Sequence, residues 1–241
     1  MEINELSKED LTKLAGLFLG ETFVHYGLWF SLSAQNMGVE DAVQLENLVI
    51  RKYFPRMLKR LAPHFRVKMD GPLPTLLKEK SREELILLIQ DTAKTWLAGD
   101  GIWFQEVEAS LGMERAKQVN DACWTHFSVM EAFKIRRFLG LGRGEGLEAL
   151  ERALKLRIYS SFNAHSSSWD EQGRLLWEMA ECRVQSTRRS KGMEDYPCKS
   201  AGVTEYSGFA RGIDPRIETQ CVYCPPDSVP AGRFCMWRFS L

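Results

Sequence analysis

With 241 residues, 44% of them hydrophobic and 27% charged, the chain has the length and composition of an ordinary globular protein of one or two domains. Its 32 basic and 32 acidic residues balance, which argues against binding to nucleic acid or anionic membranes through bulk charge. The polar, acidic N-terminus lacks the features of a signal peptide, and no apolar run approaches the roughly 20 residues of a membrane span. We therefore expect a cytoplasmic protein, whose six cysteines serve as metal ligands, reactive thiols or core residues rather than in disulfides.

The N-terminal half contains an internal repeat. Shifted by 74 positions, the sequence aligns with itself without a gap and gives eleven identities between residues 7 and 44. Ser7 and Ser81 each precede acidic residues in the pattern of a capped helix start, and Gly38 and Gly112 are typical of a break between helices. The predicted helical repeat units span residues 1–77 and 78–146.

The repeat includes the motif Gly-x-Trp-Phe, at residues 27–30 and 101–104. These aromatic residues could line a ligand pocket, but helix packing is the simpler interpretation because Trp and Phe bury the most area per residue. Cys123 lies among helix-spaced apolar residues of the second unit, and we expect it in the core.

Beyond the glycine-rich stretch at 140–146, the pattern changes to that of an α+β domain, predicted over residues 147–241. Alternating residues and turn signals predict two β-hairpins, which we expect to form one antiparallel sheet with two helices on a face. The predicted strands begin near Ile158, Leu175, Ile217 and Phe234, and the predicted helices cover about 147–156, 181–191 and 199–211.

Five of the six cysteines lie in this C-terminal domain and give the main functional signal. Cys221 and Cys224 have the two-residue gap that lets two thiolates face one ion. Cys235 lies across the second hairpin from them, and Cys198 lies at a predicted helix start, where the exposed N–H groups favour a thiolate. A tetrahedral set of thiolates selects zinc over the hard cations. The predicted zinc ligands are Cys198, Cys221, Cys224, Cys235 and Cys182.

Three other interpretations of the cysteines remain open. An iron–sulfur cluster also uses four cysteines, although this spacing matches no common ferredoxin pattern. A redox dithiol suits a CxxC pair, although this pair lies at a strand end before two prolines. The cysteines could also simply be buried.

The C-terminal segments 181–183, 197–200, 209–217, 221–226 and 235–239 resemble an uncharacterised cytosolic domain-of-unknown-function family. This likeness spans most of residues 80–241. The chain is more distantly similar to the L-2-amino-thiazoline-4-carboxylic acid hydrolase family, which shares a helical Trp-Phe pair and the C-terminal strand pattern Cys-x-[Trp/Phe]-Arg-[Phe/Tyr].

A third resemblance is architectural. A helix-start cysteine, a strand-end cysteine and a cysteine on the last strand resemble the zinc site of 4-vinyl reductase domains, which bind small molecules. The resemblance implies Cys198, Cys224 and Cys235 as ligands, with Cys182 or Cys221 as the fourth.

Two functions follow from these observations. The first is a zinc-containing small-molecule-binding protein with a largely apolar pocket between sheet and helices. The second is a hydrolase that opens a small cyclic amidine or amide at a non-peptide C–N bond. There a zinc-bound water or the Cys198 thiolate would attack, and Arg183 would hold the substrate carboxylate.

The sequence does not decide whether the chain is an enzyme. We expect a small-molecule ligand as partner, without nucleic acid or membrane, and a homo-oligomer is compatible with this.

Overall fold

The computed structural model describes residues 8, 23, 26, 27, 30, 31, 33–35, 37–71 and 73–241 of the chain. These residues belong to two compact units, Met1–Phe54 and Pro55–Leu241. The predicted helix start at Ser7 lies outside the described residues. No helix within the described ranges is both long and apolar enough to cross a membrane.

The first unit contains the beginning of helix α2 (Val39–Leu61), which continues into the second unit. Within the first unit, the Tyr26 hydroxyl donates a hydrogen bond to Glu46 Oε1 at 2.8 Å. The ring centroids of Tyr26 and Tyr53 lie 5.7 Å apart. These contacts join Tyr26 to α2.

The two repeat copies share the same local backbone where their helices break. Gly38 and Gly112 both have a positive φ, 86° and 82°, which a residue with a side chain adopts at a cost. In each copy the alanine four residues later, Ala42 or Ala116, donates its N–H to the glycine carbonyl at 3.1 Å. Both alanines are 1% exposed. The glycines therefore separate consecutive helices, as the sequence predicts.

The second unit contains most of the described elements. In chain order these are β1 (Met69–Asp70), β2 (Leu73–Pro74), α3 (Thr75–Glu79), α4 (Arg82–Leu111), α5 (Met113–Phe138), α6 (Gly146–Leu154), the 3₁₀ turn η2 (Ile158–Ser161), β3 (Ala164–Trp169), β4 (Leu175–Glu181), α7 (Arg183–Ser190), α8 (Lys199–Ile213), β5 (Glu218–Tyr223) and β6 (Cys235–Ser240).

Helix α4 begins where its sequence predicts. Ser81 Oγ accepts a hydrogen bond from the Glu84 N–H at 3.2 Å, and Glu84 Oε2 accepts one from the Ser81 N–H at 2.7 Å. This capping box satisfies two backbone donors that the first turn of a helix leaves unpaired.

The two predicted hairpins form one antiparallel sheet of four strands in the order β3-β4-β6-β5. The two hairpins meet where β4 pairs with β6, which sets Trp177 opposite Trp237 and Met179 opposite Cys235. The second unit therefore has an α+β fold, with an antiparallel sheet in its C-terminal part, as expected.

The predicted start of the first strand is wrong. Residues 158–161 form the turn η2, and strand β3 begins only at Ala164. The Ile158 N–H donates to Glu131 Oε1 at 2.7 Å, and the Ser160 hydroxyl donates to the Leu154 carbonyl at 2.7 Å. Because these polar groups already have partners from helices, the alternating pattern in this segment does not produce a strand.

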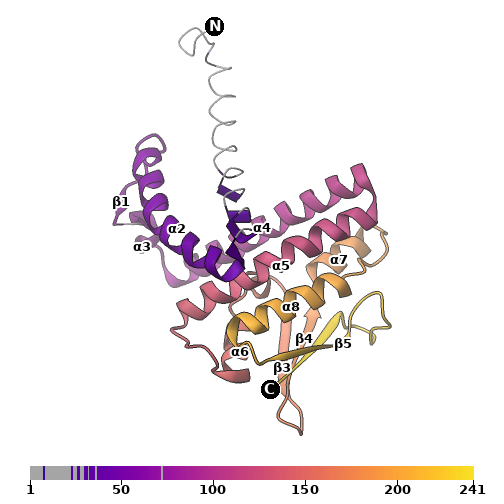
Figure 1. Cartoon of the computed structure of the whole chain (residues 1–241). Helices are drawn as coiled ribbons and strands as arrows, with labels where there is room; N and C mark the ends of the chain where they lie inside the picture. Colours follow the sequence, from indigo (N-terminus) through magenta and orange to yellow (C-terminus); the bar gives the residue numbers. More distant parts are fainter. Residues whose placement is uncertain are drawn as a thin grey trace. The chain divides into compact units, whose positions relative to one another are not determined.

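Helix α8 lies between α5 and the sheet, as Figure 1 shows. Glycines let it approach both neighbours closely. A Cβ on Gly212 would lie 2.6 Å from Ala132 Cβ on α5, and a Cβ on Gly202 would lie 2.5 Å from Trp237 Cζ2 on β6. The buried core between these layers combines aromatic and aliphatic side chains from both helices and from the sheet, including Ala132, Leu150, Leu154, Trp177, Phe209, Ile213, Trp237 and Phe239.

We predict that Gly212→Ala destabilises the protein by about 1–3 kcal/mol, because the added methyl overpacks the α5–α8 contact. Chemical denaturation followed by circular dichroism measures the loss. Gly99→Ala is the matched control, since Gly99 lies inside α4 and a Cβ there meets nothing within 4 Å. The control should be neutral or stabilising by about 0.5–1 kcal/mol. Equal stabilities of the two variants would contradict the proposed packing constraint.

Candidate functional site

A cavity of about 490 Å³ lies inside the second unit. Its walls come from α4, α5, η2, α7, α8 and the adjacent ends of the sheet. Its volume is in the range of small-molecule sites. The buried lining residues include Trp124, Met179, Gln185, Tyr196, Ala201, Gly202, Glu205, Tyr206, Cys224 and Trp237.

Aromatic side chains form much of the cavity wall. Tyr206 stacks on Trp237 with ring centroids 4.8 Å apart, and Tyr159 meets Trp124 edge to face at 6.4 Å. The indole N–H of Trp237 is buried and has no hydrogen-bond acceptor among the described residues. The aromatic part of the wall is therefore apolar and carries the unpaired indole N–H of Trp237.

The repeated aromatic motif contributes one residue to this wall. Phe104 lines the cavity and contacts the ring of Tyr196 at 5.0 Å between centroids. Trp103, by contrast, is 74% exposed, so it does not pack in the way that the simpler interpretation of the motif expects. In the first copy, Trp29 lies outside the described residues.

Four of the predicted ligands line the cavity: Cys182, Cys198, Cys224 and Cys235. The sulfur atoms of Cys198 and Cys224 lie 3.5 Å apart, and the thiol of Cys224 also contacts that of Cys235. These contacts raise the pKa of Cys224, while the hydrogen bond from Cys224 lowers the pKa of Cys198. Burial raises the pKa of Cys182 to about 12. The structure thus brings three thiols together and places a fourth in the same cavity.

The two other cysteines lie elsewhere. Cys221 is opposite Trp237 in the sheet and packs against the core, but it does not line the cavity. Burial raises its pKa to about 11. Cys123 is exposed on α5, so the expectation that it belongs to the core is wrong. The apolar residues around Cys123 do not form one buried stripe, so their helical spacing wrongly predicted that Cys123 is buried.

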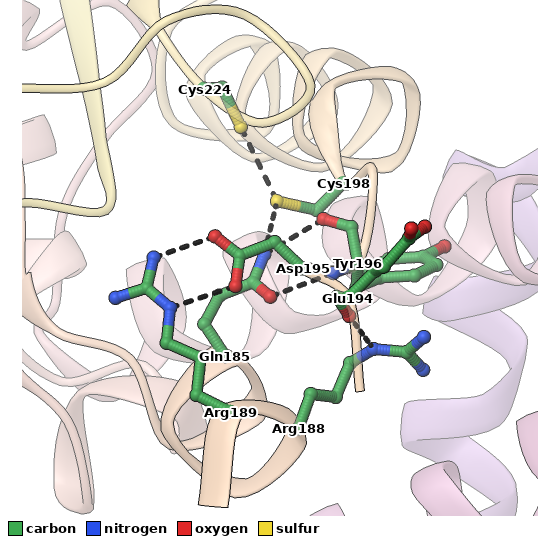
Figure 2. Close-up of polar contacts among 8 residues, drawn as sticks. All are labelled: Gln185, Arg188, Arg189, Glu194, Asp195, Tyr196, Cys198 and Cys224. Atoms are coloured by element: carbon green, nitrogen blue, oxygen red, sulfur yellow. Dashed lines mark hydrogen bonds and ion pairs between the residues drawn. The ribbon is translucent and has the colours of Figure 1, made fainter. Parts of the chain in front are cut away.

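The side chain of Gln185 holds the segment that leads to Cys198, as Figure 2 shows. Its Nε2 donates to the Tyr196 carbonyl at 2.8 Å and to Cys198 Sγ at 3.5 Å, and its Oε1 accepts from the Tyr196 N–H at 2.8 Å. On the other side, Lys117 Nζ donates to the Pro197 carbonyl. Cys198 is therefore fixed between α7 and α5 before helix α8 begins.

A buried ion cluster supports the cavity wall behind α8. Arg157 Nε donates to Glu131 Oε2 at 2.8 Å, and Nη1 donates to Glu205 Oε1 at 2.5 Å. The guanidinium carbon lies 4.6 Å from the Phe209 ring centroid, and Nη2 is buried without a partner among the described residues. Although burial opposes its charge, the two carboxylates raise the pKa of Arg157. Burial raises the pKa of Glu205, and the guanidinium opposes that shift.

Both acidic and basic residues line the cavity. Asp100 and Glu205 line it from α4 and α8, and burial raises the pKa of Asp100. The basic lining residues are Arg183, which was predicted as a substrate-binding residue, with Lys94, Arg188 and Lys191. Arg183 and Lys191 are exposed, whereas Lys94 and Arg188 are half-buried.

Two other titratable residues of the C-terminal domain, Asp214 and His165, do not line the cavity. Asp214 accepts hydrogen bonds from the Gly146 N–H at 3.0 Å and from Arg216 Nη2 at 2.7 Å. The pKa of Asp214 is lowered to about 2, mainly because Arg216 donates hydrogen bonds to its carboxylate. His165 stacks on Trp177 at 4.3 Å, and burial lowers its pKa. Both residues therefore have structural contacts that explain their positions.

Sequence reasoning did not identify Arg157, Gln185 or Asp100 as site residues. Each lies inside a helix or beside a short turn, and no motif surrounds it. The signal that could have drawn attention to Arg157 and Asp100 is a charge within an otherwise apolar helical pattern.

Among the described residues, no three His, Cys, Asp or Glu side chains form a group that could already hold a metal ion. A metal bound at the cavity would therefore require the thiols to turn toward one another. Their chemistry suits zinc, because thiolates are soft ligands.

Residues 78–241 match the family of unknown function DUF6125, and the chain belongs to that family. The matched region comprises the second repeat copy and the whole cysteine-containing domain, and thus every residue of the cavity. No curated protein sequence matches the chain, and no solved structure does.

We predict that Arg157→Met destabilises the protein by about 3–5 kcal/mol, because it leaves two buried carboxylates without their cation. Arg152→Met on the exposed side of α6 is the control and should change stability by less than about 0.5 kcal/mol. Denaturant unfolding at pH 7 compares the two. Adding Glu131→Gln and Glu205→Gln to Arg157→Met should recover part of the loss. The ion cluster would have no structural role if the two single variants unfolded alike.

Proposed function

We propose that this member of DUF6125 is a zinc-containing small-molecule-binding protein, similar in its C-terminal domain to the 4-vinyl reductase domains. The observation that carries the proposal is the cavity of about 490 Å³, which four cysteines and several aromatic rings line together. The cavity is partly open to solvent, and concave sites of this volume that are lined by aromatic rings and a few polar groups are typical of small-molecule binding.

The aromatic lining supports a ligand with a flat, apolar body. Tyr206, Trp237 and Trp124 line the cavity from three different elements, α8, β6 and α5. Burying an apolar ligand between them gains free energy in proportion to the area removed from water. The unpaired Trp237 N–H supports a ligand that also carries a hydrogen-bond acceptor.

The thiols support zinc as the metal. Four thiolates at about 2.3 Å from a tetrahedral zinc lie about 3.8 Å from one another. The Cys198–Cys224 sulfur distance of 3.5 Å is close to that value, and Cys224 also contacts Cys235. The fourth ligand would be Cys182, which shares the cavity, rather than Cys221, which does not. Bound zinc would tie α8 to the sheet, in a reducing cytoplasm that keeps the thiols free.

We predict that the full chain, purified without added metal, contains about one zinc per molecule. Cys224→Ser should lose most of the metal, because it removes the thiol that contacts two others. Cys123→Ser is the control and should keep the metal, because Cys123 is exposed away from the cluster. Elemental analysis by mass spectrometry measures the content.

The same measurement on Cys182→Ser and Cys221→Ser identifies the fourth ligand. We expect loss of zinc with the former and retention with the latter. Wild-type protein without stoichiometric zinc would refute the metal assignment, and stoichiometric iron would replace it with an iron–sulfur cluster.

The cavity should bind N-phenyl-1-naphthylamine, a neutral dye that fluoresces in apolar surroundings. We predict that Ala98→Trp weakens this binding by about tenfold, because Ala98 lies exposed on α4 at the edge of the cavity and an indole there obstructs it. Ala109→Trp lies exposed on the same helix outside the cavity and should bind the dye as the wild type does. Equal dye affinities for both variants would mean that the dye binds elsewhere.

A hydrolase remains the second candidate, and one observation favours it. The Cys198 thiol lines the cavity, and Arg183 lies at the same cavity. In that function the thiolate would attack the electrophilic carbon of a small cyclic amide or amidine, and the ring C–N bond would break as the leaving nitrogen takes up a proton. Water would then hydrolyse the thioester or thioimidate and release the thiol, while Arg183 would hold a carboxylate of the substrate. Product release that depends on Cys198 and not on Cys123 would favour this function over simple binding.

A further inference from the structure

The charges around the cavity are arranged unevenly. Among the described residues, Arg157 is the only buried cation, and it is shared between the carboxylates of Glu131 and Glu205. Asp100 adds a third carboxylate, which lines the cavity from α4 and has no hydrogen-bond or ion-pair partner among the described residues. One buried guanidinium is therefore shared by two carboxylates, and the third carboxylate, that of Asp100, has no paired cation in the described part of the chain.

The basic residues that line the cavity do not pair with Asp100. Arg183 and Lys191 are exposed, Arg188 Nε donates to the Glu194 carbonyl at 2.8 Å, and the Lys94 ammonium binds Asp91 at 3.0 Å. Charges in contact with water are screened within about 10 Å at moderate salt, whereas charges in a poorly hydrated interior are screened much less. Asp100 and Glu205 are the carboxylates that a ligand in the cavity can meet.

Two further features of the wall suit a ligand with a positive charge. Aromatic rings attract cations through their faces, and Tyr206, Trp237 and Trp124 line the same cavity as the carboxylates. The buried Trp237 N–H, which lacks an acceptor, is independent evidence for a missing polar partner at this place. A ligand that fills the cavity should therefore carry an amine and, separately, a hydrogen-bond acceptor or a π-face.

We propose that the cavity binds an organic cation, namely a flat apolar or aromatic molecule with a protonated amine placed at Asp100 and Glu205. This inference rests on the proposed small-molecule-binding function and names the ligand class. The amine would take the place of the cation that Asp100 lacks, and the apolar body would lie among the rings.

Three indoles of similar size and different charge test the inference: tryptamine, 3-ethylindole and indole-3-propionate. Their affinities for the full chain are measured at pH 7 by displacement of N-phenyl-1-naphthylamine and by calorimetry. We expect tryptamine to bind about tenfold more tightly than 3-ethylindole, and indole-3-propionate to bind most weakly, because a charge-assisted contact in a partly buried site has about this effect. The preference should persist in 0.5 M NaCl.

Asp100→Asn should remove the preference for tryptamine and leave the affinity for 3-ethylindole unchanged. Asp91→Asn is the matched control, since it removes an exposed carboxylate from the same helix outside the cavity, and it should keep the preference. Circular dichroism and the dye affinity confirm that both variants are folded.

The outcomes separate this inference from the function on which it rests. If none of the indoles and no dye bind, both the proposed function and this inference are wrong. If 3-ethylindole binds as tightly as tryptamine, the binding function stands and the cation inference is wrong. Tightest binding of indole-3-propionate would also overturn it and would assign the selectivity to the exposed basic residues.

Discussion

The structure of the second unit depends on how closely α8 can approach its two neighbours. Three glycines make this approach possible. Gly208 and Gly212 face Ser128 and Ala132 on α5, and Gly202 faces Trp237 on the sheet. Glycine inside a helix costs about 0.5–1 kcal/mol relative to alanine, so these positions are explained by packing rather than by helix propensity. With α8 in this place, Cys198 at its start and Glu205 and Tyr206 in its middle reach the cavity.

The buried ion cluster is linked to this arrangement. Arg157 lies just before η2 and binds Glu131 of α5 and Glu205 of α8, so a single side chain joins three segments that lie far apart in the sequence. Burying a guanidinium is unfavourable unless its donors are paired, and here two carboxylates and several aromatic rings surround it. The cluster holds Glu205 at the cavity wall.

The thiols and the aromatic rings occupy one continuous surface, and this connects the two parts of the proposed function. Gln185 and Lys117 fix the segment that carries Cys198, while β4 and β6 carry Met179 and Cys235 opposite each other. A metal held by the thiols would stiffen this wall of the cavity and so help to keep it open for a ligand.

The sequence by itself determined the elements whose signals are local. The capping box at Ser81, the break at Gly112 and the alternation in β4 depend on neighbouring residues, so the helices and the sheet could be predicted. The cysteine spacing likewise indicated a cluster in the C-terminal domain, and the resemblance to the 4-vinyl reductase domains implied Cys198, Cys224 and Cys235 within it. Only the tertiary structure decided the strand start at Ala164, the exposure of Cys123 and the position of Cys182 in the cavity in place of Cys221. The strand start depends on a contact between distant segments, that of Glu131 with Ile158. The positions of the cysteines depend on which side of a strand or helix faces the core. Residue spacing within one segment specifies neither of these.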